Sequence, residues 1–141
     1  MKTFDLLLEE DIEFYHGKHD DVVCQGPAFF RLLARLANDS RLPSRLRSLV
    51  LSAIAYFVLP GDVFPEEYVG PYGYIDDIYV GAFVADCAAK SIGDTSILEQ
   101  NWDGDEPVDK LVADILARES ELIGDLRGKI LGYIGYSPAQ E

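Results

Sequence analysis

Apolar residues recur along the chain with the three- and four-residue spacing of amphipathic helices. In residues 4–24 the first such positions are Phe4, Leu7, Leu8 and Ile12, interleaved with acidic residues. A second helix is predicted from Gly26-Pro27, because proline suits the first turn of a helix and a stripe of apolar residues follows. Both segments are therefore expected to be amphipathic helices that pack one face on the core.

The middle of the chain contains two more strongly apolar segments. A third helix is predicted from Ser44 to about Val58, and it is apolar on nearly every face. A fourth starts near Asp76 and continues to about Ala89. Because helices that are apolar all round are buried, we expect these two to form a central hydrophobic hairpin, with the third as the central helix of the core.

Asp86 is a charged residue within the apolar fourth helix. Its position on the helical wheel places it close to the apolar face, so burial is expected. A buried carboxylate needs a partner, and Arg45 or Arg47 is the predicted one.

The last third of the chain predicts a short helix at Ser96–Glu99, followed by a long final helix. Asp105 is the expected cap of that helix, Pro107 lies in its first turn, and its apolar stripe extends to Ile130. The pattern contains no alternating strand-like segments of note. We therefore predict an all-α fold, with residues 1–141 forming a single compact helical domain of five to seven helices.

Glycines recur at intervals of four near the end of the final helix, at Gly124, Gly128 and Gly132. Glycine lowers the stability of a helix by about 1 kcal/mol relative to alanine, so such a row needs a reason. Close approach of another backbone is one interpretation, either within the chain or across a homodimer. A frayed carboxyl-terminal tail is the other.

The stretch between the two apolar helices, Tyr56 to Asp77, is rich in proline, glycine and carboxylates. Its acidic candidates for a site are Asp62, Glu66, Asp76 and Asp77. If the helices pack antiparallel, these groups come together, and such clusters suit Mg²⁺, Mn²⁺ or Ca²⁺. The alternative is that the aspartates only cap helices and turns.

The same stretch carries three tyrosines, Tyr68, Tyr72 and Tyr74, which would supply aromatic contacts in a partner-binding loop. Support for nucleophilic catalysis is small. Both histidines fall in one early segment, and Cys87 lies in an apolar run where a thiol is inert. The sequence thus favours a non-catalytic role and leaves enzymatic activity open.

The net charge of −13 argues against nucleic acid as a ligand, because phosphate binding depends on Lys and Arg. The charge is uneven. Residues 27–60 carry five arginines and one acid, so this segment has a charge of +4 and the remainder −17. These arginines either pair with acidic segments of the same chain or form a docking face for an acidic partner or anionic lipid. Arg31, Arg35 and Arg41 are the candidates for that face.

No uncharged run approaches the roughly 20 residues that a membrane span needs. The amino terminus turns acidic where a signal peptide would continue apolar, so a cytoplasmic location is expected. Peripheral contact with a membrane stays open.

Part of the stretch resembles a known family. The YkvA-like proteins, domain of unknown function 1232, share a motif of tyrosine, prolines and aspartates between two hydrophobic helices. The matching residues here are Tyr56, Pro60, Asp62, Pro65, Gly73, Tyr74, Asp76 and Asp77. Two departures are Glu66, where aspartate is usual, and a turn between Pro65 and Gly73 that is one residue longer. The resemblance covers about residues 46–89 and implies a helical hairpin module with no established activity, membrane-associated in some members.

Three functional hypotheses follow from these features. The leading one is a non-catalytic protein-interaction or structural domain with a protein partner. The alternative is a divalent-metal-dependent, hydrolase-like enzyme with Asp62, Asp76 and Asp77 as ligands and Glu66 as ligand or general base. The weaker alternative is an acidic inhibitor or immunity-type protein that mimics nucleic acid through its negative charge.

Overall fold

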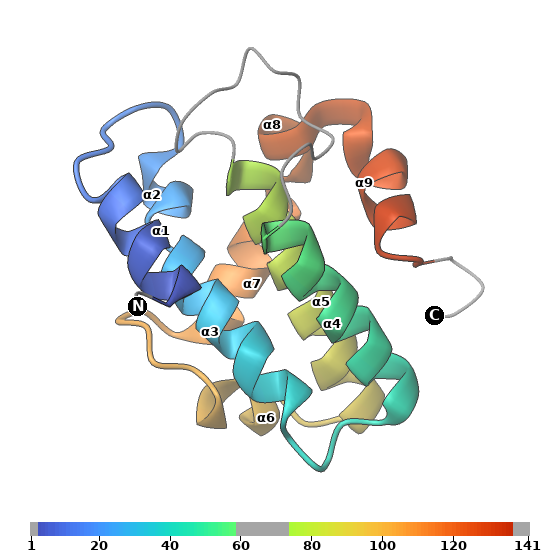
Figure 1. Ribbon diagram of the computed structural model, residues 1–141. Coiled ribbons are helices and arrows are strands. Elements are labelled where there is room, and N and C mark those ends of the chain that lie inside the picture. Colours follow the sequence, from blue (N-terminus) through green and yellow to red (C-terminus); the bar gives the residue numbers. More distant parts are fainter. Residues whose placement is uncertain (1–2, 59–73, 137–141) are drawn as a thin grey trace.

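The computed structural model describes residues 3–58 and 74–136 (Figure 1). These residues form helices and connecting turns and include no strand, which confirms the all-α prediction. The helices are α1 (Phe4–Ile12), α2 (Asp20–Val23), α3 (Gly26–Ala37), α4 (Ser44–Val58), α5 (Ile75–Ile92), α6 (Ser96–Gln100), α7 (Val108–Ala117), α8 (Glu119–Ile123), the 3₁₀ turn η2 (Gly124–Leu126) and α9 (Arg127–Tyr133).

Helix α5 lies at the centre of the molecule (Figure 1). Every residue from Ile75 to Ala85 is buried, since α3, α4 and α7 pack around the helix. Helix α3 packs directly against α5 at Gly81, where an added Cβ would be in ordinary van der Waals contact with the Cβ of Phe29, at 3.6 Å. The core is therefore organised around α5.

Helix α4 has the predicted bounds and packs antiparallel to α5, so the predicted hydrophobic hairpin is present (Figure 1). Its inner face is buried at Leu46, Val50, Ala53 and Phe57. The prediction that α4 is the central helix is wrong, since Leu51 and Val58 on its outer face are 52% and 48% exposed. An apolar pattern identifies helices that pack on a core, but it does not rank them by how many neighbours surround them.

The predicted long final helix is also wrong, because the chain bends twice after α7. Arg118 ends α7 with φ −96° and ψ 18°, and Gly124 adopts φ 58° with ψ −128°. A positive φ is available to glycine at little cost, so Gly124 lets the chain turn between α8 and η2. The apolar stripe still reaches the core at Val108, Leu122 and Ile130, because each short helix packs its own face inward.

The glycine row does not mark a close approach within the chain. Among the described residues, no heavy atom lies within 4 Å of a Cβ built at Gly124, Gly128 or Gly132. All three are exposed. Contact with a second copy of the chain at this row stays a prediction.

In residues 3–58 and 74–136 no helix combines the length and apolarity that crossing a bilayer requires.

Candidate functional sites

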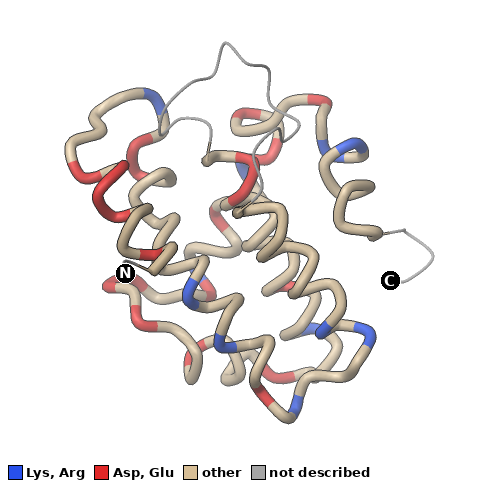
Figure 2. The backbone as a smooth tube through the Cα atoms, in the orientation of Figure 1, with Lys and Arg blue, Asp and Glu red and all other residues tan. Residues whose placement is uncertain are grey.

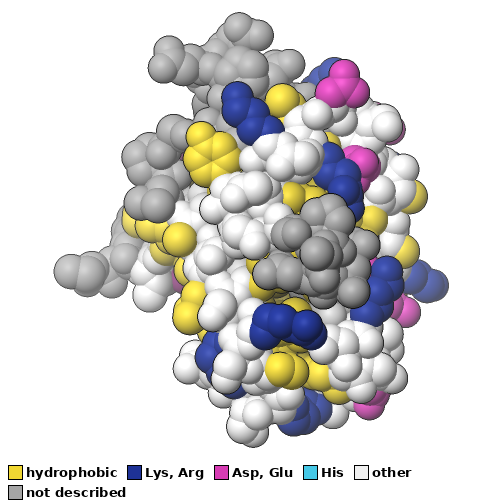
Figure 3. Space-filling model, turned by 90° about the vertical axis from the view of Figure 1, so that its right-hand side faces the viewer, with side chains coloured by type: hydrophobic (Ala, Val, Ile, Leu, Met, Phe, Trp, Pro, Cys, Tyr) yellow, Lys and Arg dark blue, Asp and Glu magenta, His cyan; other side chains and the backbone are white. Residues whose placement is uncertain are grey.

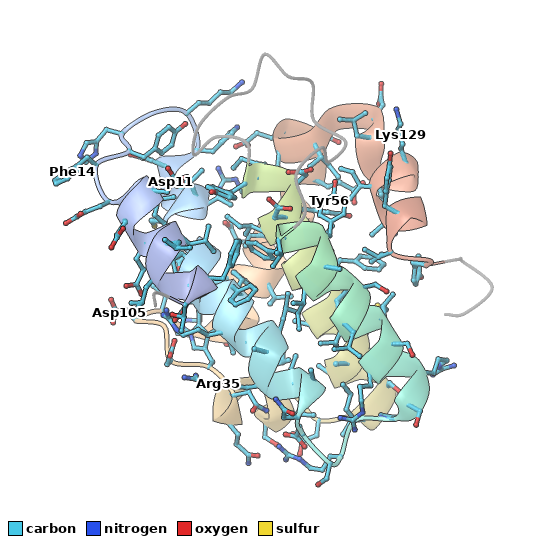
Figure 4. All side chains as sticks on the ribbon, in the orientation of Figure 1. Asp11, Phe14, Arg35, Tyr56, Asp105 and Lys129 are labelled. Carbon is cyan, nitrogen blue, oxygen red and sulfur yellow. The ribbon has the colours of Figure 1, made fainter. Side chains whose placement is uncertain are left out.

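Two adjacent carboxylates are buried at the point where α5 begins. Asp76 and Asp77 occupy the first turn of the helix and are 0% and 2% exposed. The hydroxyl of Tyr56, near the end of α4, donates a hydrogen bond of 2.6 Å to Oδ2 of Asp76. This bond joins the two helices of the hairpin and fixes their antiparallel register. In Figure 4, Tyr56 lies where the end of α4 meets the start of α5, with α9 beside them.

The first turn of a helix is also where carboxylates are stabilised by the positive end of the helix dipole. The residue before α5, Tyr74, makes no side-chain capping bond, and Asp76 and Asp77 are the second and third helical residues. Capping by these two aspartates stays a prediction.

The remaining candidate metal ligands, Asp62 and Glu66, lie outside the described residues, as do Tyr68 and Tyr72. Within the part of the chain that is described, no group of three or more His, Cys, Asp or Glu side chains is placed to hold a metal ion. A metal site that includes Asp62 and Glu66 therefore remains a prediction.

Tyr74 is the one predicted partner-binding tyrosine within the described ranges. It is partly buried, and its hydroxyl donates to Oδ2 of Asp11 at 2.8 Å. Burial, and then the hydrogen bond to Asp11, raise the pKa of the Tyr74 phenol above its usual value. This hydrogen bond links Tyr74, the residue before α5, to Asp11 in the last turn of α1.

The arginines proposed as a docking face are engaged within the chain. Arg31 pairs with Asp103 and Glu9, each at 2.9 Å, and Arg35 pairs with Asp103 at 2.9 Å. Arg41 pairs with Asp39 at 2.7 Å. These are the internal ion pairs that the sequence analysis considered as the alternative, while contact of the same arginines with a partner stays a prediction.

The predicted partner of Asp86 is wrong. Its carboxylate pairs with Lys90 one turn later, at 2.9 Å, and its side chain is 29% exposed. Arg47 instead donates to the backbone carbonyls of Ala37, Asp39 and Leu42. It thereby satisfies carbonyl groups in the turn after α3, which a search for opposite charges does not reveal.

Acidic residues are concentrated on α1 and around the start of α5, whereas Lys and Arg residues occur along α3 and at the start of α4 (Figure 2). Arg31 and Arg35 of α3 pair with Glu9 of α1 and with Asp103, so part of the acidic charge is neutralised within the chain. The nucleic-acid mimic hypothesis stays a prediction.

A surface that the sequence analysis missed lies on the outside of α4. We name the residues Leu51, Ala55 and Val58 the outer α4 stripe; all three are exposed. Tyr133 of α9 is also exposed, at 63%, but its ring lies 6.3 Å from the ring of Tyr56, which belongs to the buried side of α4. The spacing of four and three residues in the stripe was visible in the sequence, but it was interpreted as a second buried face.

A groove between α4, α5 and the carboxyl-terminal helices was also not predicted. It has a volume of about 710 Å³. We call it the α4–α5 groove, and its lining includes Arg45, Ser48, Leu49, Phe83, Asp86 and Lys90. On the face that carries α4 and α9, Lys and Arg side chains alternate with hydrophobic ones (Figure 3).

One end of the groove is held together by a chain of polar and aromatic contacts. The Tyr79 hydroxyl donates to Glu119, whose carboxylate pairs with Arg127 at 3.1 Å. The guanidinium of Arg127 lies 5.4 Å from the ring centroid of Phe83. Burial, and then the bond to Glu119, raise the pKa of the Tyr79 phenol. The network fixes the wall that α8 and α9 contribute to the groove.

The fold defines a class of protein: an all-α protein built on a hydrophobic helical hairpin, with two buried aspartates at its turn. A family model described as "Protein of unknown function (DUF1232)" matches residues 46–83, from α4 into α5. The "Uncharacterized protein ORF9" of Methanothermobacter thermautotrophicus is 33% identical over 129 residues, which cover 92% of this chain and 88% of that protein. The chain belongs to the DUF1232 family. The search of solved structures gave no significant match.

Proposed function

We propose that this helical module is a non-catalytic interaction domain that docks a protein partner on the outer α4 stripe. The observation that carries the proposal is the exposure of Leu51 and Val58, 52% and 48%, on a helix whose opposite face is in the core. Apolar side chains gathered on one exposed face are typical of protein-interaction sites.

The shape of the stripe suits a helix of a partner. Leu51, Ala55 and Val58 follow one line along α4, with the small Ala55 between two larger side chains. Small residues permit close approach of a second helix, and the larger ones provide the apolar contact.

Affinity capture with matched baits tests this proposal. The baits are the wild-type chain, Leu51→Lys/Val58→Lys, and a control with Phe14→Lys. Phe14 is 81% exposed and lies near α1, away from α4 (Figure 4). We expect a protein of the source cell to bind the wild type and the control and to be lost with the double variant, then to form a defined complex when purified.

If every captured protein binds all three baits equally, the outer α4 stripe is not the docking site. Sedimentation velocity of the chain alone distinguishes a partner from self-association. If the wild type is dimeric and the double variant monomeric, the partner is a second copy.

The second candidate function is that of a divalent-metal-dependent enzyme. The observation that favours it is the burial of the neighbouring carboxylates of Asp76 and Asp77 in the first turn of α5. Two carboxylates this close are tolerated more easily when a cation or a proton reduces their charge. With Asp62 and Glu66 they would supply the oxygen ligands that Mg²⁺, Mn²⁺ or Ca²⁺ takes.

Thermal unfolding of chelator-treated protein with each ion tests the metal hypothesis. A ligand at 100 times its dissociation constant stabilises the folded state by about 2.7 kcal/mol, so a clear rise in melting temperature is expected. The rise should be absent in Asp77→Asn and retained in Asp20→Asn, whose carboxylate is exposed on α2. The absence of a rise with any ion in the wild type excludes this candidate.

A further inference from the structure

The two ends and the middle of the α4–α5 groove differ in chemistry. The bond between Tyr56 and Asp76 sets the register of the antiparallel helices. Seven residues inward from this pair, Leu49 faces Phe83, and eleven residues inward Arg45 faces Cys87, one turn from Lys90. The groove therefore has a cationic end at Arg45 and Lys90 and an apolar middle at Leu49 and Phe83.

Among the described lining residues, the cationic end has one more positive than negative charge, since Arg45 and Lys90 stand against Asp86. Lys90 pairs with Asp86, while its own side chain is 78% exposed. Arg45 lines the groove, and its side chain makes no ion pair or hydrogen bond with another residue of 3–58 and 74–136. In a protein with a net charge of −13, an arginine that has no ion-pair partner in the described part of the chain, at the edge of an apolar groove, favours an anion. Ser48 and Ser91 add hydroxyl groups to the lining.

The volume and length of the groove suit a small molecule and are too small for a helix of another protein. A volume of about 710 Å³ lies within the range of roughly 300–1,000 Å³ typical of small-molecule sites. The lining residues on α5 extend from Tyr79 to Ser91, which at a rise of about 1.5 Å per residue gives a length of about 18 Å. A helix with side chains is about 10 Å wide, so a segment of that length would not fit in this volume.

We propose that the α4–α5 groove binds a small amphiphile with one anionic head and one unbranched apolar chain. The head lies at Arg45 and Lys90, and the chain follows the wall of Leu49 and Phe83 toward Tyr79. With C–C bonds of about 1.5 Å, an extended chain of about twelve carbons spans most of the groove. This inference concerns a surface separate from the outer α4 stripe and does not depend on the proposed docking of a protein.

Titration of the full chain with dodecanoate below its micelle concentration tests the inference, with heat or amide chemical shifts as readout. Saturable binding of one molecule per chain is expected. The same titration with dodecyltrimethylammonium, which has an equal chain and the opposite charge, is expected to bind at least tenfold more weakly. Butanoate, which keeps the carboxylate and lacks the long chain, is expected not to saturate.

Two pairs of variants locate the site. Arg45→Glu should weaken binding about tenfold or more, since a charge-assisted contact is replaced by repulsion. Lys129→Glu makes the same change of charge on α9 outside the groove lining (Figure 4) and should change affinity less than twofold. Ser52→Phe adds a ring inside the groove and should abolish binding, whereas Ala55→Phe adds it on the outer α4 stripe and should not.

The inference is overturned if dodecanoate shows no saturable binding, if the cationic amphiphile binds equally well, or if both members of each pair have the same effect. Vesicles of phosphatidylcholine with 30% phosphatidylglycerol distinguish a membrane surface. Co-sedimentation that Arg45→Glu abolishes, without binding of monomeric dodecanoate, would assign the face to a bilayer and reject the small-molecule site. Melting temperatures of all four variants verify that each is folded.

Discussion

Helices α4 and α5 are both strongly apolar, yet they occupy different environments. Helices α3, α4 and α7 pack around α5 with the shorter helices, so that its residues from Ile75 to Ala85 are all buried. Helix α4 packs mainly against α3 and α5 and leaves Leu51, Ala55 and Val58 exposed. The surplus of apolar residues in α5 is explained by the core, whereas in α4 part of it lies on the exposed outer α4 stripe, where we propose that a partner docks.

The sharpest test of this difference is truncation of one apolar side chain in each helix. Ile78 of α5 is fully buried, so Ile78→Ala should lower the free energy of unfolding by about 2–5 kcal/mol through lost contacts and the cavity left behind. Leu51→Ala on α4 should lower it by no more than about 1 kcal/mol, since half of that side chain already contacts water. Urea denaturation measures both. Equal losses would mean that Leu51 is buried in solution.

A smaller effect is expected at the bond that joins the two helices. Tyr56→Phe removes the donor to buried Asp76 and should lower the free energy of unfolding by about 1–3 kcal/mol. Tyr133→Phe is the matched control, because this ring lies beside Tyr56 and is 63% exposed. Its effect should be close to zero in the same urea experiment. A negligible loss in Tyr56→Phe would show that the bond does not stabilise the hairpin.

The ion pairs that join Arg31 and Arg35 of α3 to Asp103 also stabilise the fold, and their contribution to the free energy of unfolding should depend on pH. Burial opposes ionisation of Asp103, but the hydrogen bonds from Arg31 and Arg35 outweigh it and lower the pKa of this carboxyl. A lowered folded pKa means that the stabilisation is complete above the unfolded value of about 3.9 and is lost as pH falls through the folded value.

Asp103→Asn should therefore lower stability by roughly 1 kcal/mol or less at pH 7, since these groups are partly exposed. The difference from wild type should shrink below about pH 4. Urea denaturation at several pH values measures it. A difference that is constant from pH 7 to pH 3 would contradict the contribution of this ion pair.

The smallest change in stability should come from the outer α4 stripe itself. Leu51→Lys/Val58→Lys places two charges where the side chains already reach water, so the free energy of unfolding should change by about 0.5 kcal/mol per site or less. Denaturation of the double variant checks this value. A loss of several kcal/mol would mean that the stripe is part of the core rather than a docking surface.

The sequence predicted local structure well and spatial neighbours poorly. The start of α3 at Gly26, with its proline in the first turn, and the bounds of α4 agree with the prediction, because capping and turn preferences act over a few residues. The predicted partner of Asp86 was wrong. The choice between Lys90 and an arginine on another helix depends on how α4 and α5 pack. The break at Gly124 was missed because an apolar stripe with helical spacing continues across it.

The site was predictable only in part. The motif identified Tyr56, Asp76 and the hairpin that they join. The spacing of the outer α4 stripe is visible within one helix, but spacing alone does not show which face is exposed. The α4–α5 groove involves residues from several helices, including Phe83 and Arg127. No spacing within one segment brings such residues together.

The sequence by itself determined that this protein is all-α, where α4 begins and ends, and which family it resembles. Helical periodicity, caps and a local motif are properties of neighbouring residues, so they are legible without a structure. Tertiary packing decided which apolar helix became the centre, which acidic residues pair with Arg31 and Arg35, and which apolar side chains of α4 stayed exposed. Those outcomes depend on competition among all the helices for one core, and a single segment does not contain that information.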